Sequence, residues 1–426
     1  MKTVIHNARL VGCGAGVDPK ARSLGIAEGK IAFIGEEPDD FNAERYCDSQ
    51  DCIVMPGCVD LAAWLREPGL DYKATLASET YAAIASGITT LTYQPEPAAM
   101  VGNSAQFNLI QDINRQLGYA HIRVLGNLTL DLQGERLSNM GGLKRAGCVG
   151  VTNGWQPLQN LRVQRLAMEY ASTHSITVFI YPLEVALAAG GMVHEGAVAS
   201  RLGFAAIPSA AETVAVAQTL ALIEMTGTRV HFCRLSAEGS VRLIRQAKAQ
   251  GLPVTADVAA HQLFLTEMDI ADFNPLCHVR PPLRSERDRE ALIAGLVDNT
   301  IDAICSDHQP HEIDAKLAPF QQTEPGISAL ETLLPLTLRL VEQGYLSLEQ
   351  ALAKVTSAPA TIIDDVAGKL QIGAPADVVI LDPDHLWTLE LDSMLSQGKN
   401  TPFAGWSFNG KVTQAWLAGR HIYRME

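Results

Sequence analysis

Eight short apolar segments, separated by stretches with a helical pattern, constrain the fold of this chain more than any other feature. The helical stretches include Glu212–Met225 and Gly239–Ala249. Eight strand–helix units over roughly three hundred residues fit a (β/α)8 barrel, whose active sites lie at the carboxyl ends of the strands. The predicted strands are Ile53–Asp60, Ile88–Gln94, Ile122–Thr129, Cys148–Thr152, Thr177–Tyr181, Thr228–Cys233, Pro253–Asp257 and Ile301–Ser306.

A doubly wound open sheet gives a similar alternation of strands and helices. We favour the barrel because unusual motifs follow all of the predicted strands except the third. The sequence therefore predicts an α/β protein built on a TIM-like barrel.

Both ends of the chain are rich in strand and turn signals rather than helical ones. Alternating apolar residues punctuated by glycine predict strands. These segments are Thr3–Ile5, Ser23–Ala27, Lys30–Gly35, Ala376–Asp382 and Lys411–Gly419. We expect a small β-sandwich domain from residues 1–53 and 366–426, and a barrel domain from residues 54–365.

Composition excludes several classes of function. The net charge of −14 argues against nucleic acid or an anionic membrane as a partner, because both favour basic surfaces. No apolar run is long enough to span a bilayer, and the first residues do not resemble a signal peptide. The eight cysteines include no Cys-x-x-Cys pair, which is typical of free thiols in a reducing compartment. These features predict a cytoplasmic protein.

The run that follows the first predicted strand carries the most specific motif. It reads Asp60-Leu61-Ala62-Ala63-Trp64-Leu65-Arg66-Glu67-Pro68-Gly69. It resembles the dihydroorotase signature Asp-Leu-His-x-His-Leu-Arg-Glu-Pro-Gly, in which both histidines bind zinc. Ala62 and Trp64 occupy the two histidine positions. Neither a methyl group nor an indole N–H can coordinate a metal.

Other segments extend this resemblance almost from end to end, and together they are specific. They are Ala188–Met192, Glu195–Gly196, Ile207–Glu212, Pro281–Glu286, Ser306–His311 and Thr401–Trp406. The chain is thus similar to the dihydroorotases of the amidohydrolase superfamily.

The resemblance also says where the remaining zinc ligands of that family should stand. Asn153 replaces a carboxylate, and Tyr181 and Arg234 replace histidines, so that only Asp307 keeps its type. An amide is a poor metal ligand, and a permanently charged guanidinium repels a divalent ion. One carboxylate cannot form a four-ligand zinc site. We therefore expect no metal, no cofactor and no catalytic residue.

The positions that face the substrate in the family are only partly retained in this chain. Arg66, which holds the substrate carboxylate in the family, is kept. Glu96 would oppose an anionic ligand and Arg280 would favour one, so the resemblance implies that the substrate pocket is lost. The nine vestigial active-site positions are Ala62, Trp64, Arg66, Glu96, Asn153, Tyr181, Arg234, Arg280 and Asp307. We expect Asp307 to pair with a cation such as Arg234, and Trp64, Trp155 and Tyr181 to plug the barrel mouth.

The remaining histidines have structural interpretations. His308 and His311 lie three residues apart in a loop without a third ligand, which favours a structural role. We expect His231 to be a hydrogen-bonded core histidine and His261 to be a remnant of a His-His pair in the family.

Three functions remain. The resemblance implies a non-catalytic structural or assembly subunit of an aspartate carbamoyltransferase complex in pyrimidine biosynthesis, in a hetero-oligomer with that catalytic chain and with self-association. A metal-independent or altered-chemistry cyclic-amide hydrolase is the second, although acid–base catalysis alone supplies only about 10²–10⁴-fold. A small-molecule sensor that uses the old cavity is the third.

Overall fold

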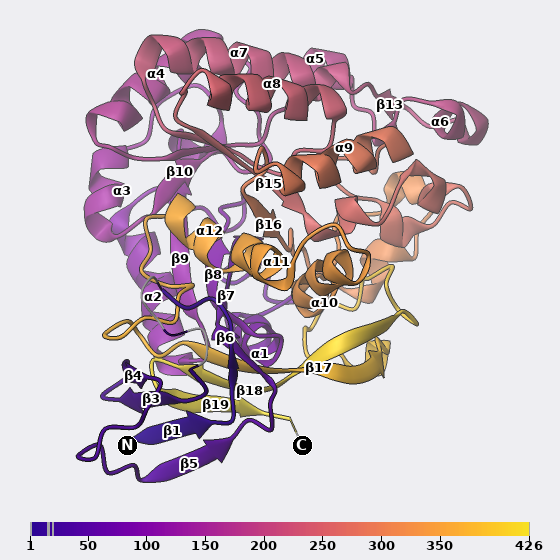
Figure 1. Cartoon of the computed structure of the whole chain (residues 1–426). Helices are drawn as coiled ribbons and strands as arrows, with labels where there is room; N and C mark the ends of the chain where they lie inside the picture. The colour runs from indigo at the N-terminus through magenta and orange to yellow at the C-terminus, as the bar shows by residue number, and fades with distance from the viewer. Residues whose placement is uncertain (1, 15–17, 19–20, 426) are drawn as a thin grey trace.

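A computed structural model of the chain describes residues 2–14, 18 and 21–425, and an eight-stranded parallel barrel forms its centre (Figure 1). The strands follow one another around the barrel in chain order. Their bounds are β7 (Cys58–Ala63), β8 (Ile88–Tyr93), β9 (His121–Asn127), β10 (Gly150–Thr152), β11 (Val178–Ile180), β14 (Val230–Phe232), β15 (Val254–Ala259) and β16 (Ala303–Cys305).

Backbone hydrogen bonds join the last barrel strand to the first. The N–H of Trp64 donates to the carbonyl of His308 at 2.9 Å, and the N–H of His308 donates to the carbonyl of Ala62 at 3.0 Å. An open sheet would leave these edges unpaired. The predicted (β/α)8 barrel is therefore confirmed.

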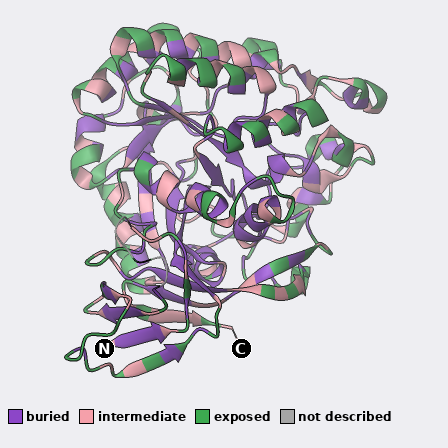
Figure 2. Cartoon of the chain, viewed as in Figure 1, coloured by how far each residue is buried: buried purple, intermediate pink, exposed green. Residues whose placement is uncertain are grey.

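Helices surround the strands, and each strand places alternate residues on opposite sides of the barrel wall. Val59, Leu61 and Phe179 belong to the cluster inside the barrel, whereas Val124 and Phe232 pack in the cluster that includes the helices. Figure 2 shows buried strands beneath helices with exposed outer faces. The helices are α1 (Leu76–Ala85), α2 (Ser104–Leu117), α3 (Met140–Ala146), α4 (Leu161–Thr173), α5 (Val185–Ala188), α6 (Ala197–Leu202), α7 (Ala210–Thr226), α8 (Glu238–Ala249), α9 (Glu286–Val297), α10 (Leu330–Glu342), α11 (Leu348–Val355) and α12 (Ser357–Ile362).

Short elements complete the loops of the barrel. A two-stranded pair, β12 (Val193–His194) and β13 (Ala206–Ile207), supports the excursion that carries α6. The 3-10 helices are η1 (Leu130–Leu132), η2 (Ala260–Leu263), η3 (Glu267–Ile270), η4 (Pro275–Cys277), η5 (Ile313–Lys316), η6 (Phe320–Gln322) and η7 (Leu391–Ser393).

Both chain ends meet in two small sheets below the barrel (Figure 1). Leu24, Ile26 and Ile31 of one sheet pack with Val378 and Trp416 of the other in a single buried cluster. The four-stranded sheet contains β4 (Lys30–Ile34), β3 (Leu24–Ala27), β1 (Thr3–His6) and β5 (Arg45–Asp48), in that order. The five-stranded sheet contains β19 (Arg420–Arg424), β18 (Ser407–Leu417), β17 (Val378–Thr388), β6 (Ile53–Pro56) and β2 (Arg9–Leu10). The expected sandwich built from both termini is confirmed.

The first predicted strand, Ile53–Asp60, is two strands. Residues 53–56 form β6 and pair with β17, whereas β7 begins the barrel at Cys58. Gly57 separates them, and a Cβ at this position would lie 2.0 Å from Oγ1 of Thr89. An unbroken apolar run does not reveal this close approach, so the single-strand prediction was wrong.

Among the described residues, no helix combines the length and apolar character required to cross a bilayer. All eight cysteines are free thiols.

Candidate functional site

Three aromatic rings occupy the carboxyl-terminal mouth of the barrel. Trp64 directly follows β7, Trp155 lies in the loop after β10, and Tyr181 directly follows β11. The indoles stack with centroids 4.9 Å apart and planes 15° apart, and Tyr181 meets Trp155 edge-on at 4.6 Å. Trp64 is 0% exposed. The prediction that these rings plug the mouth is confirmed.

Arg234, which lies just after β14, is enclosed by these rings. Its guanidinium carbon is 4.5 Å from the ring centroid of Trp155, 5.1 Å from that of Trp64 and 5.8 Å from that of Tyr181. Its Nε lies 3.5 Å from Oδ1 of Asp307, and both side chains are 1% exposed. The expected pairing of Asp307 with Arg234 is confirmed. Cation–π contacts and one carboxyl group thus surround a buried permanent charge.

Asp307 and Asp257 lie near this guanidinium and Asp60 lies near Asp307, and the environments of these three acidic side chains differ. Burial raises the pKa of Asp60 to about 6, against hydrogen bonds from Ser306. Burial also raises the pKa of Asp307 well above its ordinary value, although Arg234 opposes this shift. Burial acts to raise the pKa of Asp257 too, but the hydrogen bond from His231 and the charge of Arg234 outweigh it and lower that pKa.

Below the plug, His231, Cys233 and Asp257 form a group with the side-chain types of a metal site. One donor atom of each lies within 4.8 Å of the others. The His231 ring contacts Asp257 Oδ2 at 2.9 Å through Nε2 and Thr255 Oγ1 at 2.8 Å through Nδ1. Burial raises the pKa of the Cys233 thiol, which keeps it protonated. Three donors are one fewer than a structural zinc site uses.

This group is the functional candidate that sequence reasoning missed. The expectation that His231 is a hydrogen-bonded core histidine is confirmed, but its two neighbours were not predicted. Residues 231 and 233 are two apart, and Asp257 lies two residues beyond the register partner of His231 on the adjacent strand. The period of two along β14 was a usable signal, whereas the register with β15 required the structure.

Arg66 is already paired with a carboxylate of its own chain. Its Nη1 donates to Oε2 of Glu96 at 2.7 Å, and its Nε donates to the carbonyl of Pro310 at 3.1 Å. Burial raises the pKa of Glu96, although Arg66 opposes this shift. The carboxylate of Glu96 thus binds the guanidinium of Arg66, which in the family that this chain resembles holds the substrate carboxylate.

The other vestigial positions have ordinary structural contacts. Asn153 accepts from Thr129 at 2.6 Å and donates to the carbonyls of Leu132 and Gln156, so its carboxamide is fully used. Ala62 is buried, and its carbonyl helps to close the barrel. Arg280 is exposed, and no hydrogen bond or ion pair joins it to the other site residues described.

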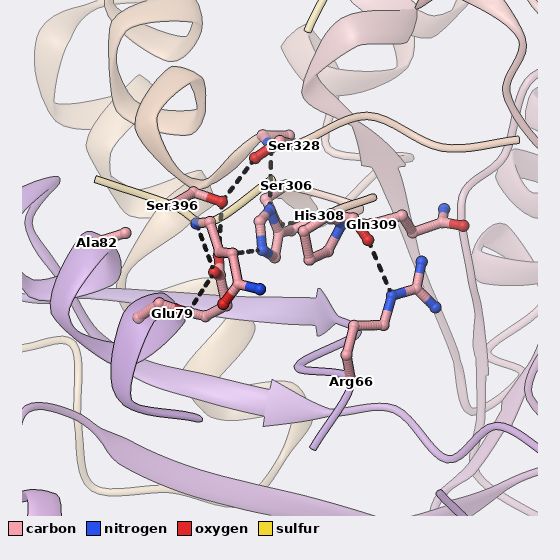
Figure 3. Close-up of polar contacts among 12 residues, drawn as sticks. Arg66, Glu79, Ala82, Ser306, His308, Gln309, Ser328 and Ser396 are labelled. Atoms are coloured by element: carbon pink, nitrogen blue, oxygen red, sulfur yellow. Dashed lines mark hydrogen bonds and ion pairs between the residues drawn. The ribbon is translucent and has the colours of Figure 1, made fainter. Parts of the chain in front are cut away.

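Of the two loop histidines, His308 belongs to a closed network at the barrel's edge (Figure 3). Its Nδ1 accepts from the N–H of Ala329 at 3.0 Å, so its proton lies on Nε2, which contacts Oε2 of Glu79 at 2.8 Å. Ser396 donates to the same carboxylate at 2.7 Å. The serine contacts the glutamate and not the histidine, so these residue types do not form a nucleophilic triad.

His311 contacts two cations of its own chain, and His261 belongs to no group of metal-ligand side chains found among the described residues. His311 lies 3.4 Å from Nη2 of Arg66 and 3.1 Å from Nζ of Lys73. Burial and these two cations lower its pKa to about 2. The structural interpretation of His308 and His311 is therefore confirmed. The buried ring of His261 has no hydrogen-bond partner for either nitrogen among the described residues, and burial lowers its pKa to about 3.

Comparisons with known proteins identify relatives along the whole chain. The family model for "Dihydro-orotase-like" proteins matches residues 51–240, and the "Amidohydrolase family" model matches residues 189–422. A "Dihydroorotase-like protein" of Pseudomonas aeruginosa is 43% identical over 98% of this chain and 99% of its own length. A "Dihydroorotase" of Syntrophotalea carbinolica is 39% identical over the full length of both chains.

Solved structures share the fold of this chain over nearly its full length. An "L-Hydantoinase (Dihydropyrimidinase)" from Arthrobacter aurescens has a TM-score of 0.86 at 25% identity, covering 99% of this chain and 96% of that one. A "D-Hydantoinase (Dihydropyrimidinase)" from Thermus sp. shares the fold with a TM-score of 0.82 at 20% identity, covering 99% and 95%. The barrel with its strand-rich ends and the relatives that match over the full length lead to one conclusion: this chain belongs to the dihydroorotase-like proteins of the amidohydrolase superfamily.

Proposed function

We propose that this chain is a non-catalytic dihydroorotase-like protein that serves as a structural subunit of an aspartate carbamoyltransferase complex. One observation carries the non-catalytic part. The guanidinium of Arg234 occupies the mouth under two stacked indoles, where the resembling family has a metal-binding histidine. A fixed cation in that position repels a divalent ion and leaves no accessible reaction centre.

The proposal is consistent with what ring opening of a cyclic amide requires. That reaction needs an activated water and a group that stabilises the developing oxyanion. The mouth residues Trp64, Arg234 and Asp307 are buried, so substrate and water would have to displace the plug. Arg66 would also have to release Glu96 before it could hold a substrate carboxylate.

An activity assay tests the non-catalytic part. We expect no interconversion of dihydroorotate and carbamoyl aspartate, with or without added zinc. The double variant Ala62→His/Trp64→His should stay inactive, because Arg234 and Tyr181 still occupy ligand positions. Zinc-dependent turnover by either protein would contradict the proposal.

The assembly part is supported by how much of the scaffold is kept while ligand positions are changed. Relatives match this chain over nearly its full length, including another "Dihydroorotase-like protein". The choice of carbamoyltransferase as partner comes from the resemblance. A specific interface on the outer helices and loops should bury at least about 1,000 Å², and closed symmetry is the usual outcome.

Co-expression tests the partner. This chain and the catalytic chain of aspartate carbamoyltransferase from the same cell should be made alone and together, and their mass and transferase activity measured. We expect co-elution, with a more active or more stable transferase. Separate elution at micromolar concentration, with a transferase that is fully active and stable alone, would refute the assembly role.

A hydrolase with altered chemistry is the second candidate, and the His231, Cys233 and Asp257 group is the observation that favours it. A metal held there would lie inside the barrel, next to Arg234. Measurement of bound metal separates this candidate from the first, as described below.

A further inference from the structure

A cavity of about 120 Å³ lies beside the aromatic plug but outside the barrel axis. It is bounded by the loop after β10, the loop after β11, and helices α4 and α7. Tyr181 and Asn153 line both this cavity and the mouth. Apart from Tyr181 and Asn153, none of the nine expected active-site positions lines this space, and the proposed assembly role does not use it.

One wall of the cavity is Gln164, a largely buried residue whose carboxamide has a fixed orientation. Gln164 is 6% exposed, and its Nε2 donates to the hydroxyl of Thr219 at 3.0 Å. That hydroxyl itself donates to the carbonyl of Ala215 at 2.8 Å, so it must accept from the glutamine. The carbonyl oxygen of Gln164 therefore faces away from Thr219, and it has no partner among the described residues.

Three more carboxamides line the same cavity. Gln156, Gln159 and Gln218 have no side-chain hydrogen bond within the described part of the chain. A carboxamide offers two donors and one acceptor group, so it can pair reciprocally with another amide. Gln156 and Gln159 are exposed and Gln218 is half-buried, so the cavity opens to solvent on this side. A ligand with the same pattern of donors and acceptors can pair with several of these amides in place of water.

Charge further narrows the class of ligand. No lysine or arginine lines the cavity, and its one carboxylate, Glu184, accepts from the N–H of Leu187 at 2.7 Å. An anionic ligand would meet this carboxylate and the Gln164 oxygen without a compensating cation. The remaining walls include Leu158, Leu161 and Phe179, which suit a compact apolar body.

We propose that this cavity binds a small uncharged molecule that carries a carboxamide or ureido group. Its size matches about six to ten non-hydrogen atoms, since an engineered cavity of about 150 Å³ in another protein holds benzene. This proposal goes beyond the assembly role and does not depend on it. Trp155 links the cavity to the plug, because it lies between Asn153 and Gln156 in the chain and contacts Tyr181 at 4.6 Å.

A pair of probes that differ in charge but hardly in shape tests the proposal. Benzamide and benzoate should be titrated into the whole protein, with binding followed by saturation-transfer NMR and by tryptophan fluorescence. We expect benzamide to bind in the millimolar range and benzoate to bind about tenfold more weakly, as the loss of one hydrogen bond implies. Equal binding of both probes would overturn the proposal, and so would the absence of benzamide binding.

Variants of the lining glutamines locate the site. Gln164→Leu and Gln218→Leu should each weaken benzamide binding by about two- to tenfold. Gln246→Leu, at an exposed position of α8, is the matched control and should leave binding unchanged. Because Gln164 is buried, folding of that variant should be checked by circular dichroism, and Gln218→Leu stands as an independent test. Unchanged binding in both cavity variants would overturn the proposal.

Discussion

Two buried polar regions lie at the same end of the barrel, and they differ in how completely their polar atoms are paired. At the junction of Glu79, His308 and Ser396, both carboxylate oxygens and both ring nitrogens have partners. In the mouth, Nε1 of Trp64, Nε and Nη1 of Arg234, and Oδ1 of Asp307 have no hydrogen-bond partner among the described residues.

Buried polar atoms are nearly always paired in proteins, so an unpaired set requires an explanation. The junction joins α1, the loop after β16 and the C-terminal segment, which is a task for stability. The mouth instead combines residues that suit neither a metal site nor an apolar core. In this region the buried groups contact aromatic rings more than hydrogen-bond partners.

The largest effect should come from opening the mouth. Trp64→Ala should lower the free energy of unfolding by about 3–5 kcal/mol, as for other buried aromatic truncations. Trp155→Ala is the matched control, since this ring is only partly buried, and it should cost less. Chemical denaturation measures both. A loss below about 1 kcal/mol for Trp64→Ala would mean that the mouth tolerates a cavity. Ring packing would then not be what stabilises the mouth, in contrast to the hydrogen bonds of the junction.

The paired junction should be almost as sensitive, but for an electrostatic reason. Glu79→Gln keeps the shape and should cost about 3–4 kcal/mol, because a neutral amide cannot replace a carboxylate that accepts from several donors. Glu331→Gln is the control, because the side chain of Glu331 accepts, among the described residues, only from the backbone N–H groups of Leu395 and Ser396. Equal losses in the two variants would show that the histidine contact adds nothing.

Two buried carboxyl groups, Asp60 beside Asp307 and Glu79 in the junction, should respond to pH with opposite signs. The pKa of Asp60 is raised to about 6 by burial, so its protonated form favours the folded state. That contribution is complete below the unfolded value near 3.8 and is lost as pH rises to about 6, amounting to about 2–3 kcal/mol. The pKa of Glu79 is lowered: burial acts to raise it, but the contacts with His308 outweigh this. Its contribution is present above 4.5 and is lost as pH falls.

Unfolding of the wild type and of Asp60→Asn between pH 4 and pH 7 measures this difference. The stability of the wild type relative to the variant should fall across that range. A relative stability that rises with pH, or that stays flat, would mean that the carboxyl of Asp60 is not held protonated by its surroundings.

The smallest expected effect concerns the amount of zinc bound to the purified protein. We expect well below one zinc per chain by elemental analysis after dialysis. Arg234 lies beside the group with metal-ligand side chains found among the described residues, and His231 of that group is hydrogen-bonded through both nitrogens. Cys233→Ser is the matched variant. One zinc per wild-type chain that disappears in Cys233→Ser would assign a metal site to this group and would favour the altered-chemistry hydrolase.

The sequence predicted the architecture well, because barrel strands are apolar runs separated by helical stretches, and each of the eight has a counterpart in the structure. It also predicted which rings meet in the mouth, since Trp64, Trp155 and Tyr181 each follow a strand end. In a barrel, strand ends converge on one face. These successes depend on local pattern and on one topological rule.

Contacts that depend on exact geometry were not predicted. The pairing of Arg66 with Glu96 brings together two loops thirty residues apart, and side-chain length and direction decide it. The grouping of His231, Cys233 and Asp257 depends on the register between β14 and β15. The break at Gly57 depends on one methyl group of space beside Thr89. Residue patterns in a single chain contain none of these distances.

The covalent attachment of the Arg234 charge has a consequence for how this protein depends on its surroundings. A cation that binds from solution stabilises a fold by mass action, so its contribution varies with the free concentration of the ion. A guanidinium built into the chain cannot dissociate, and it remains charged throughout the physiological pH range. Whatever Arg234 contributes beneath Trp64 and Trp155 is therefore present in every folded molecule, independent of any solute.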